Sequence, residues 1–442
     1  MKIYNTFLEK YLLPIGDFFL GSCYMKELQK WRKICQLSEQ EIQSLGDANL
    51  RNILDYSIKS IPFYSNLGII SHSDLKKYIS QFPIMTKKDI KENLDTLLVS
   101  DNKGLIAVSS SGSSGIQGTV YINKREQSIS RAIQTLWWEW SGYYVGKKIL
   151  QTGLVLKRGF VKKMKDIVFR VKYTSAFTSS EQEIIRILAP LKNKCGWFLG
   201  GYPSSLNIFA NITKKKNIQI CFDNAVCWGD KLFDHYKKNV KEAFGCDIYE
   251  TYGCSEGFMV AAKKDLDYFY IMSPHTYIEI IDKKGNSVED GQMGYVLLTR
   301  LDGYSMPLIR YYVGDMAIKL PKEKYPEKRE MKFPLLEKVM GRDSDIMYTQ
   351  SGKYLTVHFF SGILTHIPEI IQFKVVQYTL NTIEIWYVPS KNFSLDVLSE
   401  VEKIIHNHLQ ESFPIIWKKV NSIAPSPSGK PQLTESHLNI NF

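Results

Sequence analysis

The first hundred residues carry apolar positions at the spacing of helices. Between residues 24 and 60 such positions recur at intervals of three and four, which predicts amphipathic helix. They are Leu28, Trp31, Ile34, Leu37, Ile42, Leu45, Leu50 and Ile53. From about residue 100 the pattern changes to short apolar runs, such as 104–108 and 218–222. A polar loop follows the first run, and a helix-like stretch ending near Gly245 follows the second. Strands that alternate with helices predict an α/β architecture.

The last third of the chain has two further patterns. Residues 276–318 predict a β-meander, in which the turn at 282–286 separates two runs of alternating residues. Beyond about residue 341, strands at 373–376 and 383–388 predict a hairpin around Asn381 and Thr382. A helix with Ser394 as N-cap follows. Its apolar face contains Val397, Val401, Ile404 and Ile405.

These patterns predict a large α/β domain and a small α+β domain. The first covers residues 1–341, with a helical lead-in over residues 1–100, and combines layered sheets and helices with the meander. The second covers residues 342–442. The aromatic run 137–140 is interpreted as a packed helix.

The apolar run 11–20 is open to two interpretations. Pro14 and Asp17 interrupt it, and it lacks the charged leader of a secretory signal. It can pack onto the domain, or it can dock on a membrane surface without insertion. No stretch reaches the roughly 18 apolar residues that span a bilayer. We expect a cytoplasmic protein, with the inner face of the membrane as a further location.

Composition narrows the partners and the compartment. The formal net charge of +12 suits an anionic partner such as nucleotide, nucleic acid or a membrane surface. Seven cysteines without a CxxC pair argue against a disulfide framework or a zinc ribbon. Residues 257–275 contain His275 but no cysteine, so no zinc site is expected there.

A Ser/Gly run follows the predicted strand at 104–108. Its members are Ser110, Ser111, Gly112, Ser113, Ser114 and Gly115. Glycines let backbone N–H groups approach an anion, and hydroxyls add donors, so the run fits phosphate. Taken alone, it fits a flexible linker equally well. The sequence has no P-loop motif, and no GxGxxG opens a helix after a strand.

Several segments, in order along the chain, resemble the adenylate-forming superfamily that includes acyl-CoA synthetases, and its phenylacetate–CoA ligase and CapK-like branch above all. They are Ser110–Gly115, Gly200–Leu206, Tyr252–Glu256, Pro307–Asp315, Gly341-Arg342 and Ser428–Lys430. The resemblance spans roughly residues 100 to 435. It implies an enzyme that uses ATP and Mg²⁺ to form an acyl-adenylate and passes the acyl group to coenzyme A or an amine.

The resemblance also implies a role for each motif. The Ser/Gly run would hold the β- and γ-phosphates, and Tyr252 would stack on adenine, next to Gly253. Ser255 would bond to the AMP phosphate, and Glu256 would bind Mg²⁺ and act in catalysis.

Later motifs complete the implied site. Asp315 would accept bonds from the ribose, and Arg342 would brace ribose or phosphate. Ser344 would occupy the hinge of a mobile C-terminal domain, residues 342–442. Lys430 would be the catalytic cation for adenylation. Taken alone, the segment around Lys430 is typical of a mobile tail.

Three positions depart from the family pattern. Ile116 stands where the phosphate loop usually has a lysine, a loss that weakens phosphate binding unless a base such as Lys124 compensates. Asp230 stands where the family has a glutamate before the nucleotide motif. Ser344 replaces the usual hinge aspartate.

Two other functional classes stay open. The charge would also suit a basic nucleic-acid-binding protein, although no aromatic and basic recognition motif is present. A non-catalytic nucleotide-binding scaffold is the other, and the retention of Glu256 and Lys430 argues against it. Within the enzyme class, the CapK-like resemblance favours cell-surface polysaccharide biosynthesis.

Overall fold

A computed structural model of the chain describes residues 2–100, 103–109, 118–153, 159–176, 180–351, 354–365, 367–409, 412–424 and 433–438. The chain divides into two compact units. Unit 1 comprises residues 1–279, 297–313 and 319–338, and unit 2 comprises residues 280–296, 314–318 and 339–442. The ends of the long meander strands therefore belong to unit 2, and the first residues of this unit precede the predicted boundary at residue 341.

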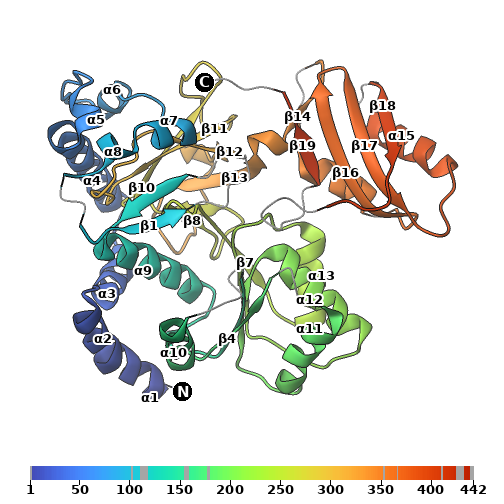
Figure 1. The fold of residues 1–442 in the computed structure, drawn as a ribbon, viewed down its shortest axis with the longest axis horizontal. Coiled ribbons are helices and arrows are strands. Elements are labelled where there is room, and N and C mark those ends of the chain that lie inside the picture. The colour runs from blue at the N-terminus through green and yellow to red at the C-terminus, as the bar shows by residue number, and fades with distance from the viewer. Residues whose placement is uncertain are drawn as a thin grey trace. The chain divides into compact units, whose positions relative to one another are not determined.

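The lead-in is helical, as the spacing of apolar residues predicted (Figure 1). The periodic region 24–60 forms two helices, because Ser38 caps the second one in a capping box with Glu41. The elements are α1 (Lys2–Phe7), the π-helical turn η1 (Leu8–Leu12), α2 (Leu13–Leu20), α3 (Tyr24–Ile34), α4 (Glu39–Ser60), α5 (Pro62–Ser65), α6 (Leu75–Ile79), α7 (Lys87–Glu92) and α8 (Leu94–Leu97).

An eleven-stranded mixed sheet forms the centre of the described fold. Its order is β10-β11-β12-β13-β9-β8-β7-β6-β5-β3-β4, and β3 to β7 pair in parallel. The strands are β3 (Ile149–Gly153), β4 (Val171–Ser175), β5 (Phe198–Gly201), β6 (Ala225–Cys227), β7 (Ile248–Gly253), β8 (Met259–Ala262), β9 (Phe269–Ile271), β10 (Thr276–Ile281), β11 (Met293–Arg300), β12 (Tyr311–Lys319) and β13 (Leu335–Arg342).

Helices and a separate hairpin accompany the sheet. Strands β1 (Ile106–Ser109) and β2 (Thr119–Ile122) pair antiparallel, with Ser109 opposite Thr119. The helices are α9 (Lys124–Trp140), α10 (Phe160–Val168), α11 (Glu181–Leu188), η2 (Ala189–Leu191), α12 (Pro203–Lys215), α13 (Asp234–Phe244) and η3 (Lys322–Lys324). Together with the sheet they confirm the α/β fold class.

One strand lies elsewhere than predicted. The apolar run 218–222 is not a strand, and β6 forms three residues later at Ala225–Cys227. Leu199 of β5 and Ile248 of β7 both pair with Ala225, so that residue occupies the position between them. The apolar run leads into β6, and its Phe222 packs against Phe244 at the end of α13.

The predicted aromatic helix at 137–140 is confirmed. It is the last turn of α9, where Trp137 and Trp140 are buried. The ring of Trp138 stacks on Trp228, with centroids 5.5 Å apart. These rings are therefore part of the packing of unit 1.

Unit 2 contains the predicted hairpin. Thr379 of β16 lies opposite Thr382 of β17, and β18 and β19 flank the pair. The helix after it begins at Asp396, two residues beyond the predicted cap, and buries Val401 and Ile405. The elements are η4 (Asp343–Asp345), β14 (Met347–Tyr348), β15 (Tyr354–Leu355), α14 (Val357–Leu364), β16 (Ile370–Thr379), β17 (Thr382–Pro389), α15 (Asp396–Leu409), β18 (Ile415–Lys419) and β19 (Thr434–Ser436).

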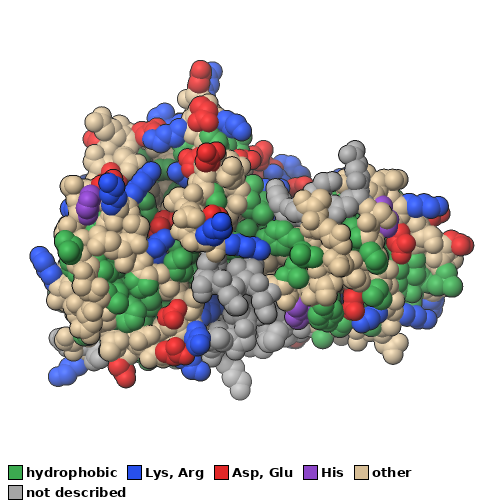
Figure 2. Space-filling view, turned by 90° about the horizontal axis from the view of Figure 1, so that it is seen from above, with side chains coloured by type: hydrophobic (Ala, Val, Ile, Leu, Met, Phe, Trp, Pro, Cys, Tyr) green, Lys and Arg blue, Asp and Glu red, His purple; other side chains and the backbone are tan. Residues whose placement is uncertain are grey.

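Two surface properties bear on function. Among the described residues, no helix is both long enough and apolar enough to cross a membrane. On the face drawn in Figure 2, Lys and Arg side chains alternate with Asp and Glu and do not gather into one basic patch. That face therefore gives no support to a nucleic-acid-binding surface.

Candidate active site

The motif Tyr252–Glu256 occupies the end of β7 and a tight turn after it. The amide of Cys254 donates to the carbonyl of Phe258, 3.0 Å away, which closes the turn. A Cβ at Gly253 would lie 2.6 Å from that same carbonyl oxygen, and Gly257 has a φ of +93°. The turn therefore requires glycine at both positions.

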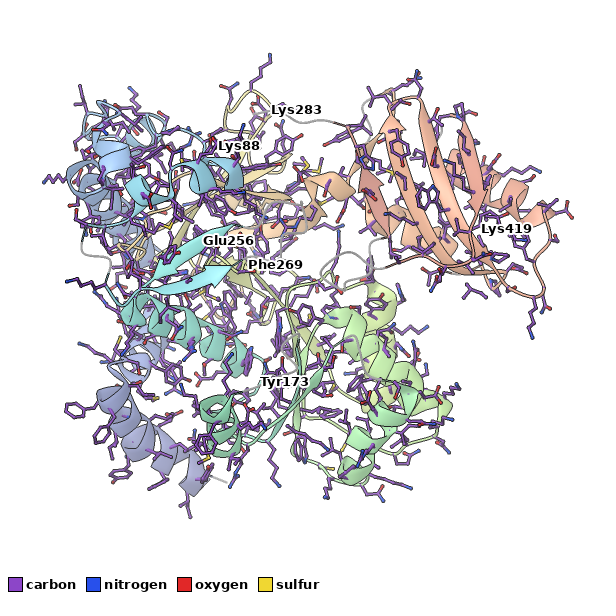
Figure 3. The ribbon with its side chains drawn as sticks, viewed as in Figure 1. Lys88, Tyr173, Glu256, Phe269, Lys283 and Lys419 are labelled. Atoms are coloured by element: carbon purple, nitrogen blue, oxygen red, sulfur yellow. The ribbon has the colours of Figure 1, made fainter. Side chains whose placement is uncertain are left out.

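The turn directs Glu256 inward. Its side chain is buried, and Tyr311 Oη donates a hydrogen bond to Oε1 at 3.0 Å. Phe258 stacks on the ring of Tyr311 and fixes the donor. In the same motif, Tyr252 is half-buried and Ser255 is exposed. Glu256 lies in unit 1 (Figure 3).

The chemistry of Glu256 fits a magnesium ligand. Within the described part of the chain, its Oε2 has no hydrogen-bond partner, and Mg²⁺ prefers such hard oxygen donors. The described residues contain no group of three or more His, Cys, Asp or Glu side chains that could hold a metal ion. In this structure Glu256 is a residue that would hold Mg²⁺, and the ion would screen phosphate charge.

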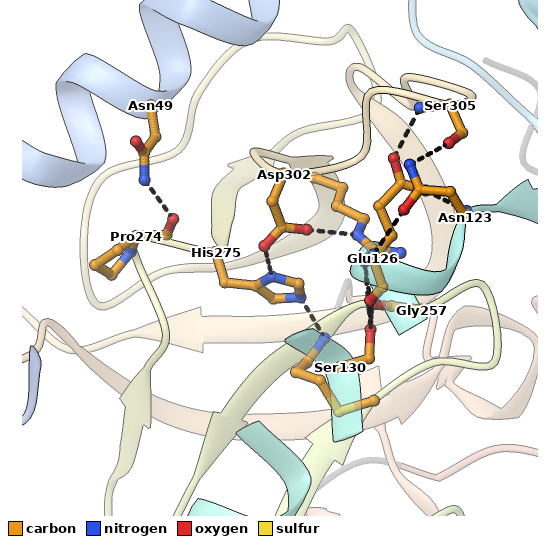
Figure 4. Close-up of polar contacts among 11 residues, drawn as sticks. Asn49, Asn123, Glu126, Ser130, Gly257, Pro274, His275, Asp302 and Ser305 are labelled. Carbon is orange, nitrogen blue, oxygen red and sulfur yellow. Dashed lines mark hydrogen bonds and ion pairs between the residues drawn. The ribbon is translucent and has the colours of Figure 1, made fainter. Parts of the chain in front are cut away.

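A buried histidine holds the far side of this turn (Figure 4). The amide of Met259 donates to His275 Nε2 at 3.1 Å. Because Nε2 accepts, the proton of the neutral ring is on Nδ1, which donates to Asp302 Oδ2 at 2.5 Å. His275 is completely buried. Its two bonds link the strand after Glu256 to the loop after β11.

Arg300 and Glu126 extend the cluster to α9. Arg300 Nε donates to Asp302 Oδ1 at 2.8 Å, and its Nη2 donates to the carbonyl of Glu126 at 2.9 Å. The Glu126 carboxylate accepts from the amide of Ser305 at 2.8 Å. Ser130 Oγ donates to the carbonyl of Gly257 at 3.2 Å, which returns the chain of bonds to the turn.

The electrostatics of this cluster depend on Asp302. Burial alone would raise the pKa of its carboxyl, but hydrogen bonds from His275 and Arg300, together with the charge of Arg300, outweigh burial and lower that pKa to about 2. The carboxylate is therefore ionised across the physiological range and compensates the buried guanidinium.

The predicted phosphate loop, Ser110–Gly115, lies outside the described residues. Its flanking strands are described, and the pairing of Ser109 with Thr119 brings the two ends together as a hairpin. Lys124, the suggested replacement for the missing loop lysine, donates to the carbonyl of Leu20 at 2.8 Å. That bond engages Lys124 in structure and does not support the replacement.

Asp230 follows β6 in the chain and lies next to the first turn of α12. Its carboxylate accepts from Ser204 Oγ at 2.5 Å and from the amide of Lys231 at 2.8 Å. Ser204 belongs to the segment 200–206 that resembles the ligases. The structure therefore brings together two of the motifs that lie before the nucleotide turn.

Asp315, Arg342 and Ser344 all belong to unit 2. Arg342 Nε lies 3.2 Å from Asp315 Oδ1, so the two predicted ribose residues form an ion pair. Gly314 has a φ of +78°, which places the chain before Asp315 in a conformation that favours glycine. Ser344 is exposed, and its amide donates to Asp343 Oδ1 at 2.6 Å.

Lys430 also lies outside the described residues, but both flanks of its segment are described. The amide of Ile423 donates to Gln372 Oε1 at 3.1 Å, and the carbonyl of Leu433 accepts from the amide of Val375 at 2.9 Å. Both partners belong to β16. The segment is therefore anchored to one strand on both sides.

Sequence reasoning missed Tyr311, Arg300 and Asp302, and it weighed His275 only as a zinc ligand. One signal was present: Asn123 and Glu126 have the spacing of a capping box, which the structure confirms at the start of α9. The other partners come from distant strands and have no local signature.

We predict that Asp302→Asn lowers the free energy of unfolding by about 2 kcal/mol near neutral pH, because the shift of its pKa reflects stabilisation of that order. The contribution is complete above the ordinary carboxyl pKa of about 4 and is lost as pH falls toward about 2. Urea unfolding across this range should show the free energies of unfolding of the wild type and the variant converging at acid pH. Asp267→Asn, at an exposed aspartate, is the control; a difference independent of pH would contradict the role of Asp302.

Sequence comparisons identify proteins that this chain resembles. No protein-family model matches the sequence. Protein CapK of Staphylococcus aureus is 22% identical over 438 residues, which cover 96% of this chain and 95% of CapK. A phenylacetate-coenzyme A ligase of Thermus thermophilus is 20% identical over 391 residues, or 83% of this chain and 85% of that protein.

A solved structure agrees with the sequence relatives. The 2-hydroxyisobutyryl-CoA ligase in its postadenylation state, with R3-HIB-AMP, superposes with a TM-score of 0.71 over 92% of each chain, at 17% identity. The fold is thus that of a ligase of this kind, and the sequence relationship extends along nearly the whole chain. The chain is thus similar along most of its length to CapK and to a phenylacetate-coenzyme A ligase, and it has the fold of a solved CoA ligase.

Proposed function

We propose that the chain is an ATP-dependent ligase that activates a carboxylic acid as an acyl-adenylate and transfers the acyl group to coenzyme A or an amine. The observation that carries the proposal is Glu256, a buried carboxylate held by Tyr311 through one oxygen, with no partner at the other in the described chain. The names of the relatives, two CoA ligases and CapK, support the same reaction class.

In the first half-reaction, an oxygen of the substrate carboxylate attacks the α-phosphorus of ATP. An acyl–oxygen–phosphorus linkage forms, and pyrophosphate leaves. Lys430 stabilises the negative charge that builds on the phosphoryl oxygens. Glu256 would hold Mg²⁺, and the ion would screen phosphate charge. Ser110–Gly115 bind the β- and γ-phosphates through hydroxyls and amides, and Tyr252 stacks on adenine.

In the second half-reaction, a thiol or amine attacks the acyl carbon, and AMP leaves with the electrons of the broken carbon–oxygen bond. Asp315 and Arg342 contact the ribose and phosphate of the nucleotide. Their ion pair keeps the Asp315 carboxylate oriented, since one oxygen already meets the guanidinium. The acceptor decides whether the product is a thioester or an amide.

The biological setting that we propose is cell-surface polysaccharide biosynthesis. The support is the near full-length similarity to CapK. In that setting the chain would work in the cytoplasm, at the inner face of the membrane, and the acid would be one that modifies a sugar.

The experiment that tests the activity is ATP–pyrophosphate exchange over a panel of carboxylic acids, amino acids and uronic acids. Exchange with any member of the panel supports carboxylate activation and identifies the substrate class. ATP binding without exchange for any acid would favour the nucleotide-binding scaffold.

We predict that Glu256→Gln lowers pyrophosphate exchange on the order of 100-fold, because it removes the charge that binds the metal. The amide oxygen of Gln can still accept from Tyr311, so the midpoint of thermal unfolding should change little. In calorimetric titration with ATP, the affinity of the wild type should depend on Mg²⁺, and the affinity of the variant should not. Tyr311→Phe keeps the carboxylate and should have a smaller effect; equal wild-type ATP affinity with and without Mg²⁺ would exclude Glu256 as the ligand.

We predict that Lys430→Ala raises the barrier to adenylation by roughly 2–4 kcal/mol, since one stabilising charge is removed. Pyrophosphate exchange should therefore be nearly lost, while transfer from a chemically synthesised acyl-adenylate to the acceptor should persist. Lys419→Ala is a matched control, because Lys419 is exposed in unit 2 (Figure 3) and has no proposed role.

Ser344→Pro is the complementary variant. It removes the amide that bonds to Asp343 and stiffens the proposed hinge, so transfer should slow while exchange persists. If Lys430→Ala exchanges normally, or loses both half-reactions equally, its assigned role is wrong.

A further inference from the structure

Residues 2–20 form one continuous helix despite Pro14. Proline has no N–H to donate, and here the preceding turn widens to a π-helical one, in which the amide of Leu13 donates to Leu8, five residues back. The helix ends at Gly21 in the left-handed conformation. The apolar run that Pro14 interrupts in the sequence is therefore not interrupted in the structure.

One face of this helix is apolar and exposed. Phe18 and Phe19 are 82% and 79% exposed, and Leu8 alone among the described side chains of the helix is buried. Eight of the nineteen large hydrophobic side chains that are exposed in the described chain belong to it. They are Ile3, Phe7, Tyr11, Leu12, Ile15, Phe18, Phe19 and Leu20. Such a concentration is unusual for a surface that only meets water.

Helix α10 adds a second exposed apolar face beside the first (Figure 1). Phe160, Met164 and Ile167 are all exposed and lie at intervals of four and three residues, on one side of α10. Tyr4 Oη donates to the carbonyl of Val168 at 2.8 Å and joins the two helices.

Charge on these helices is segregated. The carboxylates turn inward: Glu9 binds Arg32 at 2.7 Å, and Asp17 accepts from the amide of Met25 at 2.8 Å. The remaining carboxylate, Asp166, is half-buried. The lysines Lys10, Lys162 and Lys163 are exposed instead. The outward surface of both helices is thus apolar with a cationic border.

We propose that the exposed faces of Lys2–Leu20 and α10, here named the apolar platform, bind the surface of an anionic lipid bilayer. Aromatic and aliphatic side chains would enter the boundary between headgroups and acyl chains, and the lysines would meet anionic headgroups. A second copy of the chain fits less well, because a symmetric pair would bring the lysines of both copies together. The proposal rests on this surface and does not require the ligase activity.

The test is co-sedimentation of the full chain with vesicles of phosphatidylcholine mixed with phosphatidylglycerol, and with vesicles of phosphatidylcholine alone. The wild type should bind the anionic vesicles at low salt and be released as salt rises. Phe18→Ser combined with Phe19→Ser should weaken binding roughly tenfold or more, since two exposed rings are lost. Lys162→Glu combined with Lys163→Glu should weaken binding to the anionic vesicles only.

Ile70→Ser and Leu395→Ser are matched controls, because each residue is 74% exposed and neither belongs to the platform. Both should bind as the wild type does, and the phenylalanine variant should keep pyrophosphate exchange in solution. Failure of the wild type to bind anionic vesicles, or undiminished binding by the phenylalanine variant, would overturn the proposal. So would a wild type that forms dimers without lipid, does not bind vesicles, and becomes monomeric in the phenylalanine variant.

Discussion

The turn after β7 buries Glu256, Gly257 and Phe258 in unit 1, and each N–H and C=O group buried there needs a partner. That constraint explains the polar cluster around it. His275 accepts from the amide of Met259, and Ser130 donates to the carbonyl of Gly257. Because these partners are themselves held by Asp302 and Glu126, the position of one carboxylate depends on the loop after β11 and on α9. A buried group left unpaired costs about 1–3 kcal/mol, whereas a typical hydrogen bond contributes about 1 kcal/mol net.

The elements that the sequence predicted best are those whose signal is local. The helices of residues 24–60 have both their apolar spacing and the Ser38 cap within the segment itself. The hairpin of β16 and β17 likewise follows from alternation around a short turn. The run 218–222 misled because its composition is that of a strand. Whether a strand forms there depends on β5 and β7, which pair with Ala225 instead.

The site divides in the same way. Glu256 and Tyr252 could be named in advance through the resemblance to a family motif, whose residues are consecutive in the sequence. Tyr311 could not be named, since it lies 55 positions from the carboxylate that it holds. Arg342 illustrates a third case: a residue expected at the nucleotide also forms an ion pair with Asp315, its partner in the predicted site.

The anchoring of the Lys430 segment to β16 limits how that lysine can travel. Leu433 is fixed on β16 only three residues after Lys430, and three residues of extended chain reach about 10 Å at most. A residue near a free chain end can sample a large volume, but a residue only three positions from a fixed point must stay close to that strand. Any long excursion of the ammonium group must therefore be a displacement of the four-stranded sheet that holds it. The rigidity of that sheet, more than the sequence around the lysine, would then determine how precisely the ammonium group is positioned.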